Sequence, residues 1–142
     1  MAEHDLWHTL RDHGRKFGHF ERIENMVGRG RPDVNYCVAG VEGNIELKQI
    51  ARWPSRPDSP VSVPHFTPQQ RIWIRTRLSA GGRVYVLLEV VRPVVWYGLL
   101  PGEWARVNLD RTATEEAVRL AALATGEGRF PVESLMAQLT AV

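Results

Sequence analysis

Three side chains in the first half of the chain are of the types that assist hydrolysis of phosphate esters. Asp33 follows Pro32, and after twelve intervening residues comes Glu46, with Lys48 two positions further on. If residues 44–50 form a strand, Glu46 and Lys48 point to the same face, about 7 Å apart along the chain. An aspartate that opens the preceding strand can then bring a second carboxylate to the same place.

Two carboxylates and one ammonium group suit the hydrolysis of a phosphodiester with a bound metal ion. Magnesium prefers hard oxygen ligands in octahedral geometry, commonly one or two carboxylates together with water and phosphate oxygens. Such an ion polarises the phosphate and lowers the pKa of a bound water. A nearby lysine can orient that water or neutralise charge that develops on the phosphate. The alternative interpretation is structural, because Pro-Asp is a common turn pair and an exposed Glu-Lys ion pair stabilises a protein little.

The segments around these residues read as strands of a sheet. Residues 33–39 and 44–50 are expected strands, and residues 28–32 and 40–43 are turns on either side of the first of them. Residues 83–91 contain a continuous apolar run, which is typical of a strand covered on both faces. The expected strands are residues 17–24, 33–39, 44–50, 83–91 and 94–100.

Helices are expected before and after these strands. A helix over residues 3–13 carries Leu6 and Leu10 on one side and ends at Gly14. Five prolines stiffen a long loop over residues 52–68, and loops of this length are often functional.

The helix after this loop has a clear N-terminal signal. Thr67 and Gln70 form a Thr-x-x-Gln capping box, and Pro68 occupies the first helical position, where proline is well tolerated. The helix is expected to run to about Ala80.

The last part of the chain adds helices near residues 113–125 and after Pro131, where apolar residues recur at helical spacing. The order of elements predicts an α/β fold with a mixed central sheet flanked by helices. We expect residues 1–100 to form a core domain and residues 101–142 to form a C-terminal helical extension packed on the same domain.

Composition is that of a globular protein and favours a nucleic-acid partner. The 142 residues are 44% hydrophobic and 24% charged, close to the average. Of the 18 basic residues 16 are arginines, and residues 1–92 carry 14 basic and 10 acidic side chains, a net charge of +4. Residues 93–142 carry 4 basic and 6 acidic side chains, a net charge of −2. Arginine makes forked contacts with phosphate, although a genome rich in arginine codons explains the same bias.

Location and membrane association follow from the same composition. No apolar run approaches the roughly 20 residues that span a bilayer, and the first residues lack the basic and apolar regions of a signal peptide. The single cysteine, Cys37, excludes an internal disulfide and a cysteine-based zinc site. We therefore expect a cytoplasmic protein with no membrane partner.

Four short motifs follow one another along the chain: Gly30-Arg31-Pro32-Asp33, Ile45-Glu46-Leu47-Lys48, Gln70-Arg71, and Gly81-Gly82 before an apolar strand. In these motifs the chain resembles the PD-(D/E)XK nuclease superfamily. Within that superfamily it is most similar to the compact Holliday-junction-resolvase-like and VRR-NUC branches, which include small phage nucleases. The resemblance covers residues 3–92 and implies a restriction-endonuclease-like core with the element order αβββαβ.

The resemblance also implies roles for individual residues. Asp33 and Glu46 would bind Mg²⁺ or Mn²⁺ together with the backbone carbonyl of Leu47, and Lys48 would assist the attacking water. Many members of the superfamily add an acidic residue from the first helix, for which Glu3 is the candidate by position. Its rivals on the strand before the aspartate are Glu21 and Glu24.

Further residues are candidates for contacts with nucleic acid: Arg29, Arg31, Gln70, Arg71, Arg75 and Trp53. Arg29 and Arg31 could grip a phosphate next to the site, and the alternative is a charged turn. Arg71 and Arg75 lie one helical turn apart and could follow a DNA backbone, or they are solvated surface residues. Gln70 could reach the site, although its capping role explains it as well. The ring of Trp53 could stack on an unpaired base.

These expectations together describe a metal-dependent endonuclease that hydrolyses phosphodiester bonds of DNA. Branched or junction DNA is one substrate class that fits, and a homodimer would suit it because two cuts need two sites. One alternative is a non-catalytic nucleic-acid-binding module with a nuclease-like fold. Another is an interaction or packaging protein whose acidic tail binds a protein partner.

Overall fold

A computed structural model describes residues 3–24 and 30–141, with the side chains of the first helix described from Asp5 onward. The helices are α1 (Glu3–Gly14), α2 (Pro68–Ser79), α3 (Gly102–Asn108), α4 (Glu115–Ala121) and α5 (Val132–Leu139). The strands are β1 (Gly18–Arg22), β2 (Val34–Val38), β3 (Val41–Arg52), β4 (Val84–Arg92), β5 (Trp96–Pro101) and β6 (Ala124–Glu127). Among the described residues, no helix has the length and apolar character needed to cross a bilayer.

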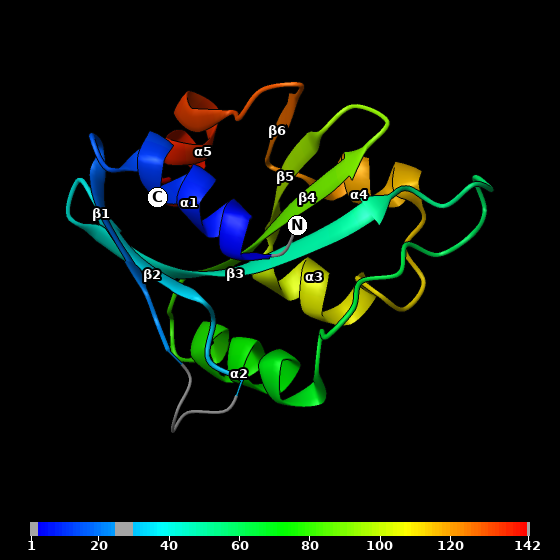
Figure 1. The fold of residues 1–142 in the computed structure, drawn as a ribbon. Helices are drawn as coiled ribbons and strands as arrows, with labels where there is room; N and C mark the ends of the chain where they lie inside the picture. Colours follow the sequence, from blue (N-terminus) through cyan, green and yellow to red (C-terminus); the bar gives the residue numbers. More distant parts are fainter. Residues whose placement is uncertain (1–2, 25–29, 142) are drawn as a thin grey trace.

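The strands form one mixed sheet whose spatial order is the order of the chain, from β1 to β6. All neighbouring strands are antiparallel except β3 and β4, which run parallel. A parallel pair needs a crossover connection, and here the chain crosses through the long loop and α2 (Figure 1). The predicted α/β architecture with a mixed central sheet is confirmed.

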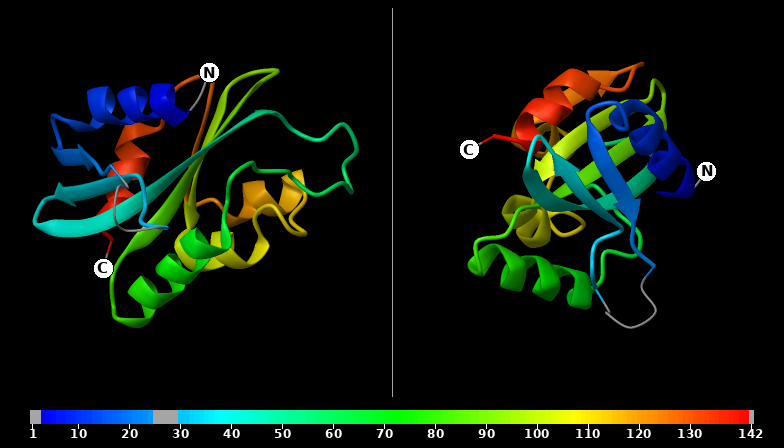
Figure 2. Two further views of the ribbon diagram at one scale, coloured as in Figure 1. Left: turned by 60° about the horizontal axis from the view of Figure 1, so that its bottom comes forward. Right: turned by 90° about the vertical axis from the view of Figure 1, so that its left-hand side faces the viewer.

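Helices cover both faces of the sheet. One apolar cluster joins α1 and α5 to β1, β2 and the odd-numbered residues of β3, such as Ile45 and Leu47. A second cluster joins α2, α3 and α4 to the opposite face, which includes Ile50 and Val86. Figure 1 shows α1 and α5 above the sheet and α2 and α3 below it, and the right-hand view of Figure 2 shows the same layers from the side.

The hairpin between β2 and β3 is tighter than the sequence predicted. Only Ala39 and Gly40 separate the strands, and both have positive φ, at 50° and 80°. Such two-residue loops match the right-handed twist of the strands that they join. As a result β3 begins at Val41 instead of residue 44, and it continues to Arg52.

The long loop after β3 is held against the α2–α4 side of the sheet. Val61, Val63 and Phe66 are buried there. The Val61 N–H donates to the carbonyl of Ala113 at 2.7 Å, and the Val63 N–H donates to Asp110 Oδ1 at 2.7 Å. The proline-rich segment is therefore part of the packed structure.

The tail differs most from the prediction. The helix expected over 113–125 is shorter, because α4 ends at Ala121. Neither α3 nor β6 was predicted from the sequence. Leu123 N–H donates to the carbonyl of Leu99 at 2.8 Å, so the chain leaves α4 to pair with β5. The helix expected after Pro131 is confirmed as α5.

Candidate active site

The candidate site lies where the pairing of β3 with β2 ends. Pairing between these strands starts at Val34 and Ile45, so β3 pairs with β4 alone from Glu46 onward. Side-chain alternation places Glu46 and Lys48 on the face covered by α2, and the apolar neighbours Ile45 and Leu47 on the other. The predicted orientation of Glu46 and Lys48 toward one face is confirmed.

Asp33 comes to this site from the residue just before β2. Its Oδ2 accepts a hydrogen bond from the Leu47 N–H at 2.9 Å, which fixes the carboxylate beside β3. The N–H and C=O of one strand residue point to the same edge, so the carbonyl of Leu47 also faces Asp33. The predicted backbone ligand therefore lies on the same edge as the aspartate.

A glycine allows the segment before Asp33 to approach α2. Gly30 has φ of +83°, and a Cβ at this position would collide with the backbone carbonyl of Gln69. Only glycine fits there without displacing one of the two segments. The close approach holds the loop that carries Asp33 against the first turn of the helix.

Glu46 is a buried carboxyl group, with 2% of its surface exposed. Burial, together with the neighbouring Asp33 carboxylate, raises its pKa from 4.5 to about 8, although Lys48 acts in the opposite direction. Asp33 and Glu46 are close enough to share a hydrogen bond. Two carboxyl groups that cannot both ionise without cost form a place that favours a cation.

Lys48 is as deeply buried as Glu46, and its ammonium group makes three polar contacts. Its Nζ lies 3.2 Å from Glu46 Oε2, donates to the carbonyl of His65 at 2.9 Å and donates to Gln70 Oε1 at 3.1 Å. This geometry fixes the ammonium group next to the carboxylates. Removing either charge would leave the other buried without its partner.

Gln70 both caps α2 and contacts the site, the two roles that the sequence left as alternatives. Its Oε1 accepts from the Thr67 N–H at 3.0 Å, which completes the capping box, and the same oxygen accepts from Lys48. The N-terminus of α2 is thereby connected to the site. The capping box at Thr67 is confirmed.

Phe66 contacts both Lys48 and Arg71, and it was not among the residues predicted from the sequence. Its ring lies 5.1 Å from Lys48 Nζ and 4.0 Å from Arg71 Cζ, measured to the ring centroid. A signal for it was present, because an apolar residue just before an N-cap commonly packs against the fourth helical position. Here that position is Arg71, whose flat guanidinium covers the ring.

Among the side chains that the structure describes, no third carboxylate lies with Asp33 and Glu46. No group of three potential metal ligands is found among them. Glu21 pairs with Asn35 in the register of β1 and β2, and both Glu21 and Glu24 are exposed. Glu3 opens α1, whose helix packs on the opposite face of the sheet from Glu46. The side chain of Glu3 lies outside the described residues.

Two of the expected nucleic-acid contacts need correction. Arg71 is not a surface arginine, since only 7% of it is exposed and its guanidinium donates to the carbonyls of Arg106 and Leu109 at 2.7 and 2.9 Å. Trp53 is not an exposed platform either. It is 8% exposed, and its ring lies 5.1 Å from that of Trp96, with a guanidinium over it.

The other expected contacts remain on the surface where the structure describes them. Arg31 is exposed beside the loop that carries Asp33, and Arg75 is exposed on α2. Arg29 falls outside the described residues.

Comparison with solved structures identifies the fold. The chain is similar to a Holliday junction resolvase, Hjc, from the archaeal hyperthermophile Archaeoglobus fulgidus, with a TM-score of 0.55 and 18% sequence identity over 84% of this chain and 89% of that one. This likeness shows the fold, which is the restriction-endonuclease-like fold that the sequence motifs implied. No family model and no curated protein sequence matches the chain.

Proposed function

We propose that this protein is a metal-dependent nuclease that cleaves DNA at the site formed by Asp33, Glu46 and Lys48. The observation that carries the proposal is the buried Glu46 carboxyl, placed beside the Asp33 carboxyl and 3.2 Å from the Lys48 ammonium. Burial of two ionisable groups, Glu46 and Lys48, is costly for folding. Sites that bear such a cost commonly serve chemistry, and these groups lie where the pairing between β2 and β3 ends.

The residues fit a divalent cation such as Mg²⁺ or Mn²⁺. Asp33 and Glu46 supply hard oxygen ligands on one side, and the carbonyl of Leu47 lies on the same edge. A cation here would relieve the repulsion that raises the pKa of Glu46. When bound, it would polarise the scissile phosphate and lower the pKa of a water molecule.

The protein residues would divide the remaining work. The bond from the Leu47 N–H orients Asp33, so that one carboxylate oxygen is fixed and the other is left for a ligand. Lys48, fixed by Gln70 and the His65 carbonyl, would orient the attacking water and stabilise negative charge on the phosphate. We retain Glu3 as the candidate third acid, in preference to the exposed Glu21 and Glu24.

The fold neighbour, a Holliday junction resolvase, suggests a substrate class. We propose that branched DNA is among the substrates, and that a homodimer supplies two sites when two strands are cut. Contacts of Arg31 and Arg75 with the phosphate backbone would add affinity for DNA, whether it is branched or not.

The test is cleavage of a labelled panel of duplex, single-stranded, flap and four-way-junction DNA, each with Mg²⁺, Mn²⁺ or EDTA. Asp33→Asn and Glu46→Gln should each abolish metal-dependent cutting while the circular dichroism spectrum stays unchanged. Glu89→Gln is the matched control, because Glu89 is a buried carboxylate on the opposite face, bonded by Gln49 Nε2 at 2.6 Å. It should retain activity.

Two results would contradict the proposal. Cutting that survives Glu46→Gln would move the chemistry to other residues. DNA binding without cutting, with every metal and every substrate, would instead favour a binding module that keeps the nuclease fold.

A further inference from the structure

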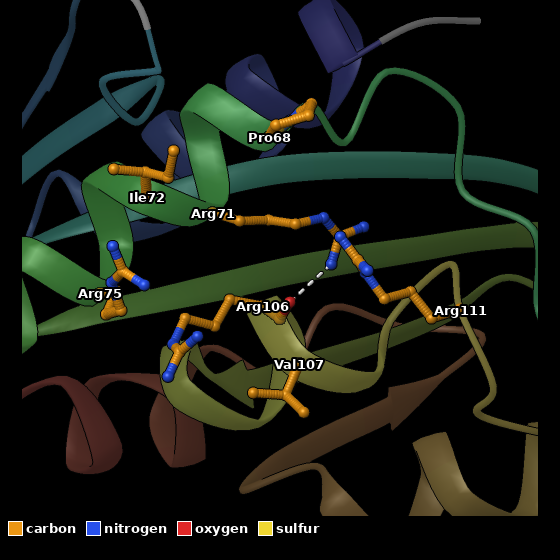
Figure 3. A pocket seen from close by; sticks show the side chains of 7 residues that line it. All are labelled: Pro68, Arg71, Ile72, Arg75, Arg106, Val107 and Arg111. Carbon is orange, nitrogen blue, oxygen red and sulfur yellow. Dashed lines mark hydrogen bonds between the residues drawn. The ribbon is translucent and has the colours of Figure 1, made fainter.

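A second feature of the molecule is a pocket lined by four arginines. It lies between α2 and the segment that begins with α3, and it has a volume of about 330 Å³, within the size range of small-ligand sites. Arg71 and Arg75 come from α2, Arg106 from α3, and Arg111 from the turn that follows. Figure 3 shows the guanidinium groups of Arg71 and Arg111 side by side in this pocket.

The positive charge of this pocket is only partly compensated. Arg106 forms an ion pair with Glu103 at 2.7 Å, but the bonding partners of Arg71 are neutral carbonyl groups. Neither Arg75 nor Arg111 forms an ion pair with a carboxylate among the residues that the structure describes. Burial and the nearby Arg111 lower the pKa of Arg71, and they outweigh the Asp110 carboxylate, which raises it, as expected where cations outnumber the anions near them.

The pocket also has apolar surface. Ile72 and Val107 line it, and both are about half exposed, at 53% and 48%. A phosphate bound by guanidinium forks, with a sugar against apolar side chains, uses both kinds of surface. A free metal cation or a basic peptide would be repelled.

The pocket adjoins the candidate active site through one aromatic ring. Phe66 contacts Lys48 on the site side and Arg71 on the pocket side, at 5.1 and 4.0 Å from the ring centroid. One ring therefore separates the ammonium of the site from the first guanidinium of the pocket. The two groups are therefore no further apart than the sum of these distances, a span of at most about three nucleotides at 3.4 Å of rise per nucleotide.

We propose that the pocket formed by Arg71, Arg75, Arg106 and Arg111 is a phosphate subsite for the DNA strand that occupies the candidate active site. This inference rests on the proposed function and adds a binding site on α3, outside the part of the chain that carries the nuclease motifs. The ligand is a phosphate group of the strand, either an internal phosphodiester or a terminal 5′-phosphate. Arg71 connects α2 to α3 through its hydrogen bonds to the carbonyls of Arg106 and Leu109. Arg75 and Arg111 bind the phosphate.

The experiment measures DNA binding without cleavage. Fluorescence anisotropy of a labelled duplex, with and without a 5′-phosphate, is recorded in EDTA over a range of salt concentrations for the full chain. The Arg75→Gln/Arg111→Gln variant alters exposed side chains only, so its fold should be unchanged. The control is Arg15→Gln/Arg129→Gln, which removes two equally exposed arginines next to α1 and α5, on the other side of the sheet.

The expected result is a smaller dependence of log Kd on log salt. Loss of one phosphate contact should lower the slope by about 0.9 for the pocket variant, with weaker binding, whereas the control should keep the wild-type slope. A loss confined to the 5′-phosphorylated duplex identifies a terminal phosphate, and a loss on both duplexes identifies an internal one.

The subsite is refuted if the pocket variant keeps the wild-type slope, or if the wild-type protein does not bind DNA. Cleavage assays separate this outcome from failure of the proposed function. A wild-type protein that cuts DNA, with a pocket variant of unchanged slope, disproves the subsite alone. A changed slope without cutting by the wild type disproves the nuclease and leaves the phosphate subsite standing.

Discussion

Replacing Glu46 with glutamine should remove a loss of stability that the metal-free protein shows as the pH rises. The folded protein keeps the Glu46 proton up to a pKa of about 8, whereas the unfolded chain releases it near the ordinary value of 4.5. Folding therefore takes up a proton between these two values, and wild-type stability must fall as the pH rises through this window. Glutamine has the same shape and no proton to lose, so the variant lacks this fall.

The size of the effect follows from the displacement of the pKa. One pH unit corresponds to about 1.4 kcal/mol, so the loss across the whole window from 4.5 to about 8 is on the order of 5 kcal/mol. A difference of this size is a large fraction of the stability of a typical domain, which is about 5–15 kcal/mol. The cause is the burial of Glu46 together with its closeness to Asp33, and Lys48 offsets only part of it.

Urea unfolding in EDTA, followed by tryptophan fluorescence, provides the measurement. The free energy of unfolding of Glu46→Gln minus that of the wild type is recorded between about pH 4 and about pH 9, so that titrating groups distant from Glu46 cancel. We expect this difference to rise through the window toward alkaline pH. A difference that stays constant with pH would refute the burial argument, because it would mean that Glu46 titrates alike in the folded and unfolded chains.

Three further predictions concern single side chains. Lys48→Met should lower the rate of metal-dependent DNA cleavage by at least about 100-fold while anisotropy shows that DNA binding persists; a rate near that of the wild type would remove lysine from the chemistry. Tyr36→Phe should destabilise the fold by about 1 kcal/mol in urea unfolding, because the buried Tyr36 hydroxyl donates to the carbonyl of Leu139 at 2.9 Å; no loss would mean that α5 does not depend on this bond. Arg71→Met should cost about 2 kcal/mol in the same assay, because the carbonyls at the end of α3, including that of Leu109, lose their donor; unchanged stability would show that the guanidinium is not structural.

Local patterns in the sequence were sufficient for much of the fold. Alternation along residues 44–50 predicted that Glu46 and Lys48 share a face, since that depends only on the geometry of one strand. The capping box at Thr67 depends on residues three positions apart, and it was predicted correctly for the same reason. These features need no knowledge of the rest of the molecule.

Other features were decided by tertiary structure. The sequence could not show that Glu46 and Lys48 are buried, because the groups that hold Lys48 come from the loop and the helix 17 and 22 positions further along the chain. The same holds for Arg71, which looks like a surface arginine on its helix until α3 packs against it. The short strand β6 carries no apolar alternation, and it exists because β5 offers it an unpaired edge.

The candidate site shows the same division. Residue types and spacing alone indicated which side chains could bind a cation and assist a water molecule. Their convergence depends on Asp33 meeting the Leu47 N–H across the end of β2, a contact between residues 14 positions apart. The pKa of Glu46 and the arginine pocket beside Phe66 arise from burial and from contacts between distant segments, which are properties of the folded chain and not of any short stretch of it.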